Sequence, residues 1–234
     1  MAKAKRPVFV PIVTGFPFVK EVLIEFDWYP GFAKAQAQKC VVSLHRYASQ
    51  NGISPVLEIS SKSMQPFGVS LSAFNLMLSA KDHQQMSVEC AFQGSKVFEK
   101  GGPYQDLYSV SSREAKTDTR LRNSGDVVAF RFFGESFPTR PMTAFYDWLY
   151  ITALWQNPKS AEKLLTFKGF SDIAFNPKKS INCQARSAAL YVALHRHGAI
   201  QCVVEDKEYY ISLITGKKPQ VVPVAETTRQ LELL

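Results

Sequence analysis

The chain has few residues of the kinds that bind metals or form cross-links, and it has no long hydrophobic run. Its 234 residues include four cysteines and four histidines, and no two cysteines form the closely spaced pair typical of structural zinc sites. No apolar stretch approaches the roughly 20 residues of a transmembrane helix. The basic first residues are not followed by the apolar segment of a signal peptide. We therefore expect a reduced, cytoplasmic protein with no metal, no cofactor and no association with a membrane.

The overall composition is that of a folded protein with an excess of positive charge. Hydrophobic residues make up 46% of the chain and charged residues 21%, which argues against a disordered chain or a coiled coil. The net charge of +8 favours polyanionic partners such as nucleic acid or nucleotides. A mildly basic soluble protein without such a partner is about equally compatible with this charge.

The order of sequence patterns predicts an α+β protein with a predominantly helical core. The N-terminal part contains two extended stretches, a helix that Asn51-Gly52 ends, and a short strand, and so reads as a small β-α-β unit. Later helices are bounded by Asn157-Pro158, which suits a helix start, and by Gly198, which suits a helix end. The predicted units are an N-terminal β-α-β extension (1–67), a catalytic core (68–198) and a C-terminal tail packed on the core (199–234).

The stretch 87–98 is the most informative part of the sequence. We predict that it is one helix that continues to Gly101-Gly102-Pro103, because apolar residues recur along it at helical spacing. Four and seven residues are about one and two helical turns. Glu89, Gln93 and Lys96 therefore share a second face, and a carboxylate, an amide and an amine form one polar row. Such a row can also be an ordinary solvated face.

Cleavage of an N-glycosidic bond would use the carboxylate and the amine together. A carboxylate stabilises the positive charge that develops on the ribose in the transition state. A neutral lysine can attack the anomeric carbon and open the sugar to a Schiff base. A nearby carboxylate favours the charged, unreactive lysine, so Lys96 needs burial or a second cation, such as Lys116 or Arg113, to stay nucleophilic.

Two basic segments and several aromatic residues could bind an anionic substrate. Lys178 and Lys179 precede a helix that we expect from Cys183 to Arg196, with Ser180 or Asn182 as its cap, and the amino end of a helix suits phosphate. The segment Arg113–Lys116 could follow a phosphate backbone. Aromatic residues suited to stacking on a base include Phe74, Phe92 and Phe175. Solvated lysines and core packing are the ordinary alternatives for these residues.

Three segments in this order resemble the NADAR (YbiA-like) family. They are Leu71-Ser72-Ala73-Phe74, then Val88-Glu89-Cys90-Ala91-Phe92-Gln93-Gly94-Ser95-Lys96-Val97-Phe98, then Arg113-Glu114-Ala115-Lys116. A late asparagine that opens the last core helix in the family corresponds to Asn182. The resemblance covers about residues 68–198.

The resemblance implies a hydrolase that recognises ADP-ribose and cleaves N-glycosidic bonds. Members remove ADP-ribose from modified guanine in nucleic acid, and some are antitoxins beside DarT-like toxins, which implies such a toxin as a possible partner here. By position, Glu89 would be the catalytic carboxylate and Lys96 the Schiff-base amine. The residues assigned to substrate binding are Ser72, Phe74, Asn75, Phe92, Gln93, Arg113, Lys116, Phe175, Lys178, Lys179, Ser180 and Asn182.

Two other functions remain open at this point. The first is an N-glycosidase that acts on small nucleotides or riboflavin-pathway intermediates, and the second is a non-catalytic module that binds ADP-ribose, DNA or RNA. Binding to unmodified DNA that weakens steeply with salt would argue against a small-molecule enzyme. Trapping of a lysine imine with borohydride would separate an enzyme from a binding module.

Overall fold

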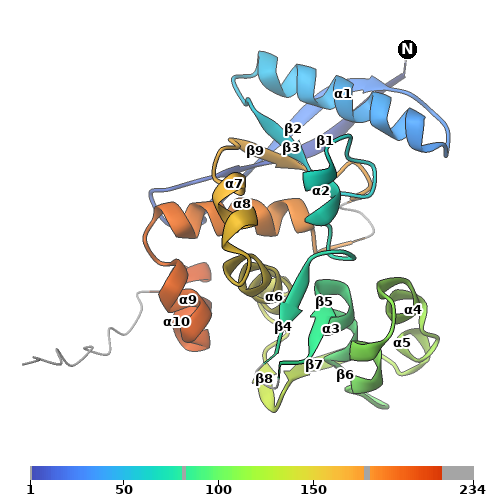
Figure 1. Ribbon diagram of the computed structural model, residues 1–234, viewed down its shortest axis with the longest axis vertical. Coiled ribbons are helices and arrows are strands. Elements are labelled where there is room, and N and C mark those ends of the chain that lie inside the picture. Colours follow the sequence, from blue (N-terminus) through green and yellow to red (C-terminus); the bar gives the residue numbers. More distant parts are fainter. Residues whose placement is uncertain (1, 81–82, 177–179, 218–234) are drawn as a thin grey trace, which may run out of the picture.

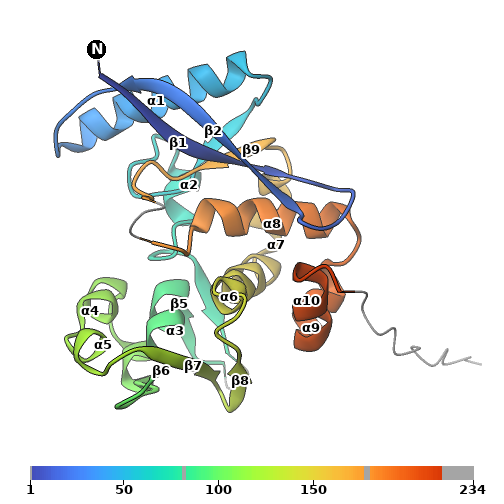
Figure 2. The same ribbon diagram turned by 180° about the vertical axis from the view of Figure 1, so that it is seen from behind.

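A computed structural model describes residues 2–80, 83–176 and 180–217 (Figures 1 and 2). Its first part is a four-stranded sheet covered by a long helix. Apolar residues of the N-terminal strands face this helix. The strand order is β2-β1-β9-β3. The elements are β1 (Ala2–Pro11), β2 (Val19–Trp28), α1 (Lys34–Gln50), β3 (Val56–Glu58) and β9 (Gly169–Ser171). Apolar side chains of β1, β2 and α1, among them Val8, Phe26 and Leu44, form a core between the helix and the sheet.

Strand β9 comes from a distant part of the chain and lies between β1 and β3. It pairs antiparallel with β1 through Phe9 and Phe170, and parallel with β3 from Val56 to Glu58. The sheet thus joins the predicted N-terminal extension to the segment 68–198. Both views show this sheet and α1 at one end of the molecule (Figures 1 and 2).

The centre of the molecule is helical. Its elements are α6 (Ala144–Trp155), α7 (Pro158–Leu164), α8 (Gln184–Arg196), α9 (Ile200–Glu205) and α10 (Lys207–Ile214). Most residues of helices α6 and α8 are buried, as expected for helices inside a core. Asn157 caps α7 by accepting a hydrogen bond from the backbone N–H of Ser160, with Pro158 in the first helical position, which confirms the sequence prediction. The hydroxyl of Tyr210 donates to the carbonyl of Ala144 and ties the C-terminal helices to α6.

The third part carries the polar row and consists of short elements. They are α2 (Pro66–Ser70), β4 (Met77–Ser79), β5 (Gln85–Ser87), α3 (Val88–Gly94), β6 (Lys96–Phe98), the 3-10 helix η1 (Gln105–Ser109), α4 (Ser112–Thr117), α5 (Arg120–Asn123), β7 (Val127–Phe132) and β8 (Glu135–Phe137). Strands β6, β7 and β8 form an antiparallel sheet. The α+β class is confirmed. Within the described parts of the chain, no helix combines the length and the apolar character needed to cross a bilayer.

The prediction of one helix over residues 87–98 is wrong in its second half. Helix α3 ends at Gly94, and Lys96 already pairs with Phe130 in the β6–β7 ladder. Gly94 packs directly against a ring, since a Cβ atom there would lie 2.5 Å from Cε1 of Tyr108. The hydroxyl of Ser95 donates to the carbonyl of Ala91. From Lys96 on, the backbone pairs with β7 instead of forming further helical hydrogen bonds.

Candidate active site

The first turn of α3 places Glu89 in the interior. Ser87 caps the helix, because its hydroxyl accepts a hydrogen bond from the backbone N–H of Cys90 at 3.1 Å. The backbone N–H of Glu89 donates to the carbonyl of Ala73 at 2.9 Å, so the loop before β4 is fixed against the helix. The side chain of Glu89 is buried, and its carboxylate lies in the first turn, where the helix dipole favours negative charge.

The three residues of the polar row form a continuous chain of hydrogen bonds. Nζ of Lys96 donates to Oε1 of Gln93 at 2.7 Å, and Nε2 of Gln93 donates to Oε1 of Glu89 at 2.8 Å. Glu89 and Gln93 are one helical turn apart, whereas Lys96 reaches the amide from the first residue of β6. The Gln93 amide therefore bridges the amine and the carboxylate.

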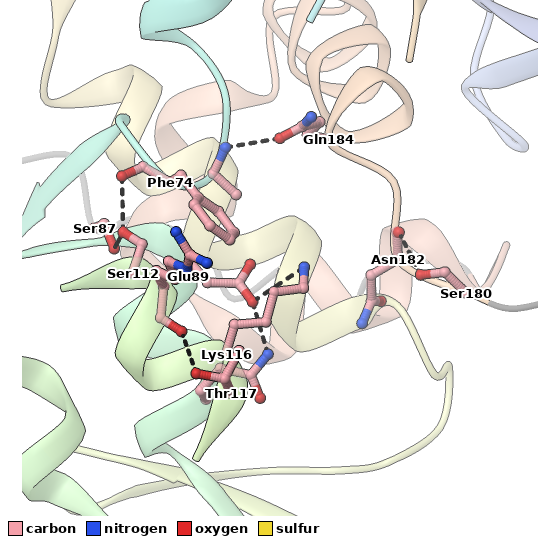
Figure 3. Close-up of polar contacts among 12 residues, drawn as sticks. Phe74, Ser87, Glu89, Ser112, Lys116, Thr117, Ser180, Asn182 and Gln184 are labelled. Atoms are coloured by element: carbon pink, nitrogen blue, oxygen red, sulfur yellow. Dashed lines mark hydrogen bonds and ion pairs between the residues drawn. The ribbon is translucent and has the colours of Figure 1, made fainter. Parts of the chain in front are cut away.

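Lys116 approaches Glu89 from a separate helix. Its Nζ lies 3.5 Å from Oε1 of Glu89 (Figure 3) and 5.1 Å from the ring centroid of Phe74. Helix α4 carries Lys116 and begins with a capping box, in which Ser111 and Glu114 bond each other's backbone N–H groups. This helix brings a second amine to the carboxylate.

The amine of Lys96 is unusually acidic. Burial lowers its pKa to about 8, Glu89 opposes this shift, and the nearby charge of Lys116 adds to it. Burial has this effect because a poorly solvated site disfavours the charged form of an amine. The pKa value allows a substantial neutral fraction near neutral pH, which a nucleophilic role requires.

Glu89 lies where two cavities meet. The larger cavity has a volume of about 570 Å³ and contains most of the predicted substrate-binding side chains. Its lining includes Glu89, Ser72, Phe74, Asn75, Lys116, Phe175, Ser180 and Asn182, together with Asp172, Tyr146 and Gln184. Its size is within the roughly 300–1,000 Å³ typical of small-molecule sites.

The second cavity, of about 460 Å³, also reaches Glu89. It adds Phe92, Gln93 and Lys96 and shares Glu89, Lys116, Tyr146, Ser180 and Asn182 with the first. The ring of Phe92 is buried, stacks on Phe130 at 5.5 Å and lies 4.7 Å from Nζ of Lys96. A ligand that occupies both cavities would pass over the carboxylate and the amine.

Some predicted site residues do not join this arrangement. Arg113 is exposed and lines a separate groove, which shares Phe74 and Asn75 with the larger cavity. Lys178 and Lys179 lie outside the residues that the structure describes.

Asn182 points toward the space next to Lys116 and Glu89 (Figure 3). Its Oδ1 atom is buried and has no hydrogen-bond partner among the described residues, so it is free to bind a donor on a ligand. The predicted cap of α8 is wrong, because Cys183 occupies the N-cap position without a side-chain cap. The hydroxyl of Ser180 instead donates to the carbonyl of Asn182 at 3.2 Å.

A half-buried polar cluster that lines the larger cavity was not predicted from the sequence. Nε2 of Gln184 donates to Oδ2 of Asp172 at 2.9 Å and to the carbonyl of Ile59 at 2.6 Å, while its Oε1 accepts from the backbone N–H of Ala73 at 2.7 Å. Burial raises the pKa of Asp172 to about 6. Gln184 thus positions both the acid and the loop that contacts Glu89, and Figure 3 shows its bond to this loop beside Phe74.

A fully buried acid, Glu58 on β3, lies next to Asp172. Burial and the neighbouring Asp172 raise its pKa to about 8. Oγ of Ser171 lies 2.5 Å from its Oε2, and Oγ of Ser60 and the backbone N–H of Ile173 donate to its Oε1. A charged residue within an otherwise apolar strand was the available signal for this group. Across the described residues, no three or more His, Cys, Asp or Glu side chains gather in a way that could hold a metal ion.

The fold and the site together define an α+β protein with a buried carboxylate–amide–amine row between two cavities. A family model described as DarT1-associated NADAR antitoxin matches residues 4–222. The chain therefore belongs to this family, as the resemblance predicted. The match also covers the N-terminal sheet, so the resemblance to residues 68–198 alone was too narrow. No curated protein matches the chain.

Proposed function

We propose that the protein is an N-glycosidase that removes ADP-ribose from ADP-ribosylated guanine in DNA or RNA, and that it acts as an antitoxin to a DarT-like ADP-ribosyltransferase. The observation that carries this proposal is the row of Glu89, Gln93 and Lys96, with the pKa of Lys96 lowered to about 8. Membership of the DarT1-associated NADAR antitoxin family supports the choice of substrate and the antitoxin role.

In the first half of the reaction, the bond between the anomeric carbon and guanine breaks. Glu89 stabilises the positive charge that develops on the ribose. The neutral amine of Lys96 attacks the anomeric carbon, and the departing guanine takes the bonding electron pair. The proton that the attacking nitrogen loses passes to guanine.

In the second half, the sugar is released from the enzyme. The ring oxygen accepts a proton as the ribose opens to an imine with Lys96, and a water molecule then adds to the imine carbon. Collapse of this adduct breaks the bond to Lys96, restores the amine and gives free ADP-ribose. The net reaction consumes one water molecule and yields guanine and ADP-ribose.

Other groups of the cavities would bind and orient the substrate. Lys116 brings a cation to the carboxylate side of the site, and Phe74 and Phe175 offer rings at the cavity surface for stacking on a base. The unpartnered Oδ1 of Asn182 can accept a hydrogen bond from a ribose hydroxyl. Lys178 and Lys179 remain predicted phosphate contacts.

The test measures release of ADP-ribose from a guanine-modified oligonucleotide and trapping with borohydride. We expect Glu89→Gln and Lys96→Ala to lose release, and wild-type protein to form a covalent adduct that mass spectrometry locates at Lys96. Lys159→Ala, on the exposed face of α7, serves as the control. Release at the wild-type rate by both active-site variants would refute the mechanism.

Two results would favour the other functions. Cleavage restricted to small nucleotides or riboflavin-pathway intermediates would identify a small-molecule glycosidase. Tight binding of ADP-ribose without release or adduct formation would identify a binding module.

A further inference from the structure

A chain of shallow grooves runs along the surface beside the larger cavity. Neighbouring grooves share lining residues: Asn75 links the cavity to a groove under α2, and Met64 links that groove to one along α1. On the other side, Phe74 and Asn75 link the cavity to the groove that contains Arg113. We call this surface the flanking groove and define it by Lys34, Lys39, Arg46, Met64, Asn75 and Arg113. In both views α2 lies between α1 and the α3–α5 part (Figures 1 and 2).

The charge of the flanking groove is entirely positive. Its described lining includes Lys34, Lys39, Arg46 and Arg113 and contains no aspartate or glutamate. Lys34 and Lys39 are exposed and form no ion pair with any described residue. Arg46 is partly neutralised, because Nη2 lies 2.8 Å from Oδ2 of Asp27. Cations without matching carboxylates are the electrostatic pattern of a surface that binds phosphates.

Between these cations the groove exposes apolar side chains. Val42, Met64 and Met77 are about half exposed, at 50%, 56% and 48%, and Phe74 is 39% exposed. Phe74 also lines the larger cavity, so its ring lies where the groove meets the site. Bases stack on such surfaces with little regard to sequence, and each stacked base contributes about 1–3 kcal/mol in single-strand binding proteins.

We propose that the flanking groove binds the single-stranded nucleic acid on both sides of the modified guanine. This inference rests on the proposed function and extends it, because it assigns the surface that holds the nucleotides next to the modified guanine. The continuity of the groove with the cavity through Asn75 lets the modified nucleotide enter the site while its neighbours stay on the surface. Such an enzyme must take the reacting base out of a stack, which costs least in a single strand.

The first experiment measures binding of an unmodified 12-nucleotide single-stranded DNA by fluorescence anisotropy between 50 and 300 mM salt. The test variant is Lys34→Glu/Lys39→Glu, and the control is Lys159→Glu/Lys168→Glu, which makes the same charge change at exposed residues outside the groove. Each phosphate contact contributes about 0.7 to the slope of log K against log salt for single strands. We expect the slope to fall by about 1.4 in the test variant and to stay unchanged in the control. An equal slope in both variants overturns the proposal.

The second experiment separates this inference from the proposed function. For wild-type protein, KM and kcat are compared on a modified DNA oligonucleotide, a modified RNA oligonucleotide of the same sequence and ADP-ribosylated guanosine. We expect the test variant to raise KM for the better oligonucleotide with kcat unchanged, and to leave the guanosine reaction unaffected. Equal effects on polymer and nucleoside overturn the inference but leave the glycosidase intact.

Two further outcomes are decisive. If wild-type protein cleaves none of the three substrates, the proposed function is wrong. If, in addition, the slope of log K against log salt for DNA binding by wild-type protein is near zero, the proposal that the flanking groove binds nucleic acid is also wrong. If the test variant loses binding of a purified DarT-like toxin but keeps DNA binding, the groove is a protein interface and the inference is wrong. Circular dichroism and the thermal midpoint verify that each variant is folded.

Discussion

The acidity of Lys96 predicts the pH dependence of the reaction. With a pKa of about 8, roughly a tenth of the amine is neutral at pH 7 and roughly nine tenths at pH 9. The rate of imine formation should therefore rise about tenfold over this interval and then level off. An ordinary lysine, at a pKa of 10.5, would be neutral in only about one molecule in 3,000 at pH 7, and its rate would still be rising at pH 10.

Replacing Lys116 tests the electrostatic part of this acidity, which adds to the larger effect of burial. The charge of Lys116 lowers the pKa of Lys96, whereas the charge of Glu89 raises it. Lys116 also pairs with Glu89. Lys116→Gln removes the repulsion and leaves the carboxylate free to act on the amine, so both effects raise the pKa of Lys96. We expect the midpoint of the pH–rate profile to move to higher pH and the rate at pH 7 to fall.

The assay is single-turnover release of ADP-ribose from modified oligonucleotide, with enzyme in saturating excess, between pH 6 and pH 10. Excess enzyme removes product release and turnover from the measured rate, and the yield of borohydride trapping at each pH is a second readout. Lys159→Gln should show the wild-type profile. A rate that climbs tenfold per pH unit beyond pH 9, or a midpoint in Lys116→Gln at or below that of wild type, would refute the reasoning.

Three further substitutions test the support of the site. Gln93→Leu removes the bridge and one donor to buried Glu89, so the single-turnover rate should fall and urea titration should show a loss of about 1–3 kcal/mol in unfolding free energy. The pKa of Glu58 is raised to about 8 from 4.5. The contribution of Glu58 to the stability of the folded protein is therefore fully present below about pH 4.5 and is lost as pH rises through 8. In a series of thermal melts at different pH values, Glu58→Gln should remove this decline in stability. Gly94→Ala forces a Cβ atom against Tyr108, and we expect a lower melting temperature, from about 1–3 kcal/mol of overpacking, and a lower trapping yield; unchanged values in either measurement would contradict the close packing at this position.

Elements with local signals were predictable from the sequence. Helix α1 ends at Gln50, directly before the Asn51-Gly52 stop, and α7 starts at the predicted Asn157-Pro158. In each case residues within one turn of the boundary determine where the helix begins or ends. Glu89, Gln93 and Lys96 were also found from local spacing, and they do form one connected row.

Features that depend on distant contacts were not predictable. The residues after Gly94 keep helical spacing, but pairing of Lys96 with Phe130, more than thirty residues later in the chain, makes them a strand. Asp172 becomes a site residue only because β9 enters the N-terminal sheet and Gln184 binds its carboxylate. Neither event leaves a pattern within a single stretch of sequence.

The change from helix to strand at Gly94 also answers how the amine can stay neutral beside a carboxylate. In one continuous helix, Glu89 and Lys96 would lie about two turns apart on one face, and a lysine on a solvated face would keep its usual pKa and stay charged. Strand β6 instead buries Lys96 over the ring of Phe92 and directs its Nζ to the amide of Gln93. The ion-pair partner of Glu89 within the described chain is then Lys116. Two separate elements thus divide the work: strand β6 leaves the nucleophile in a poorly solvated place, and helix α4 gives the carboxylate a cation of its own.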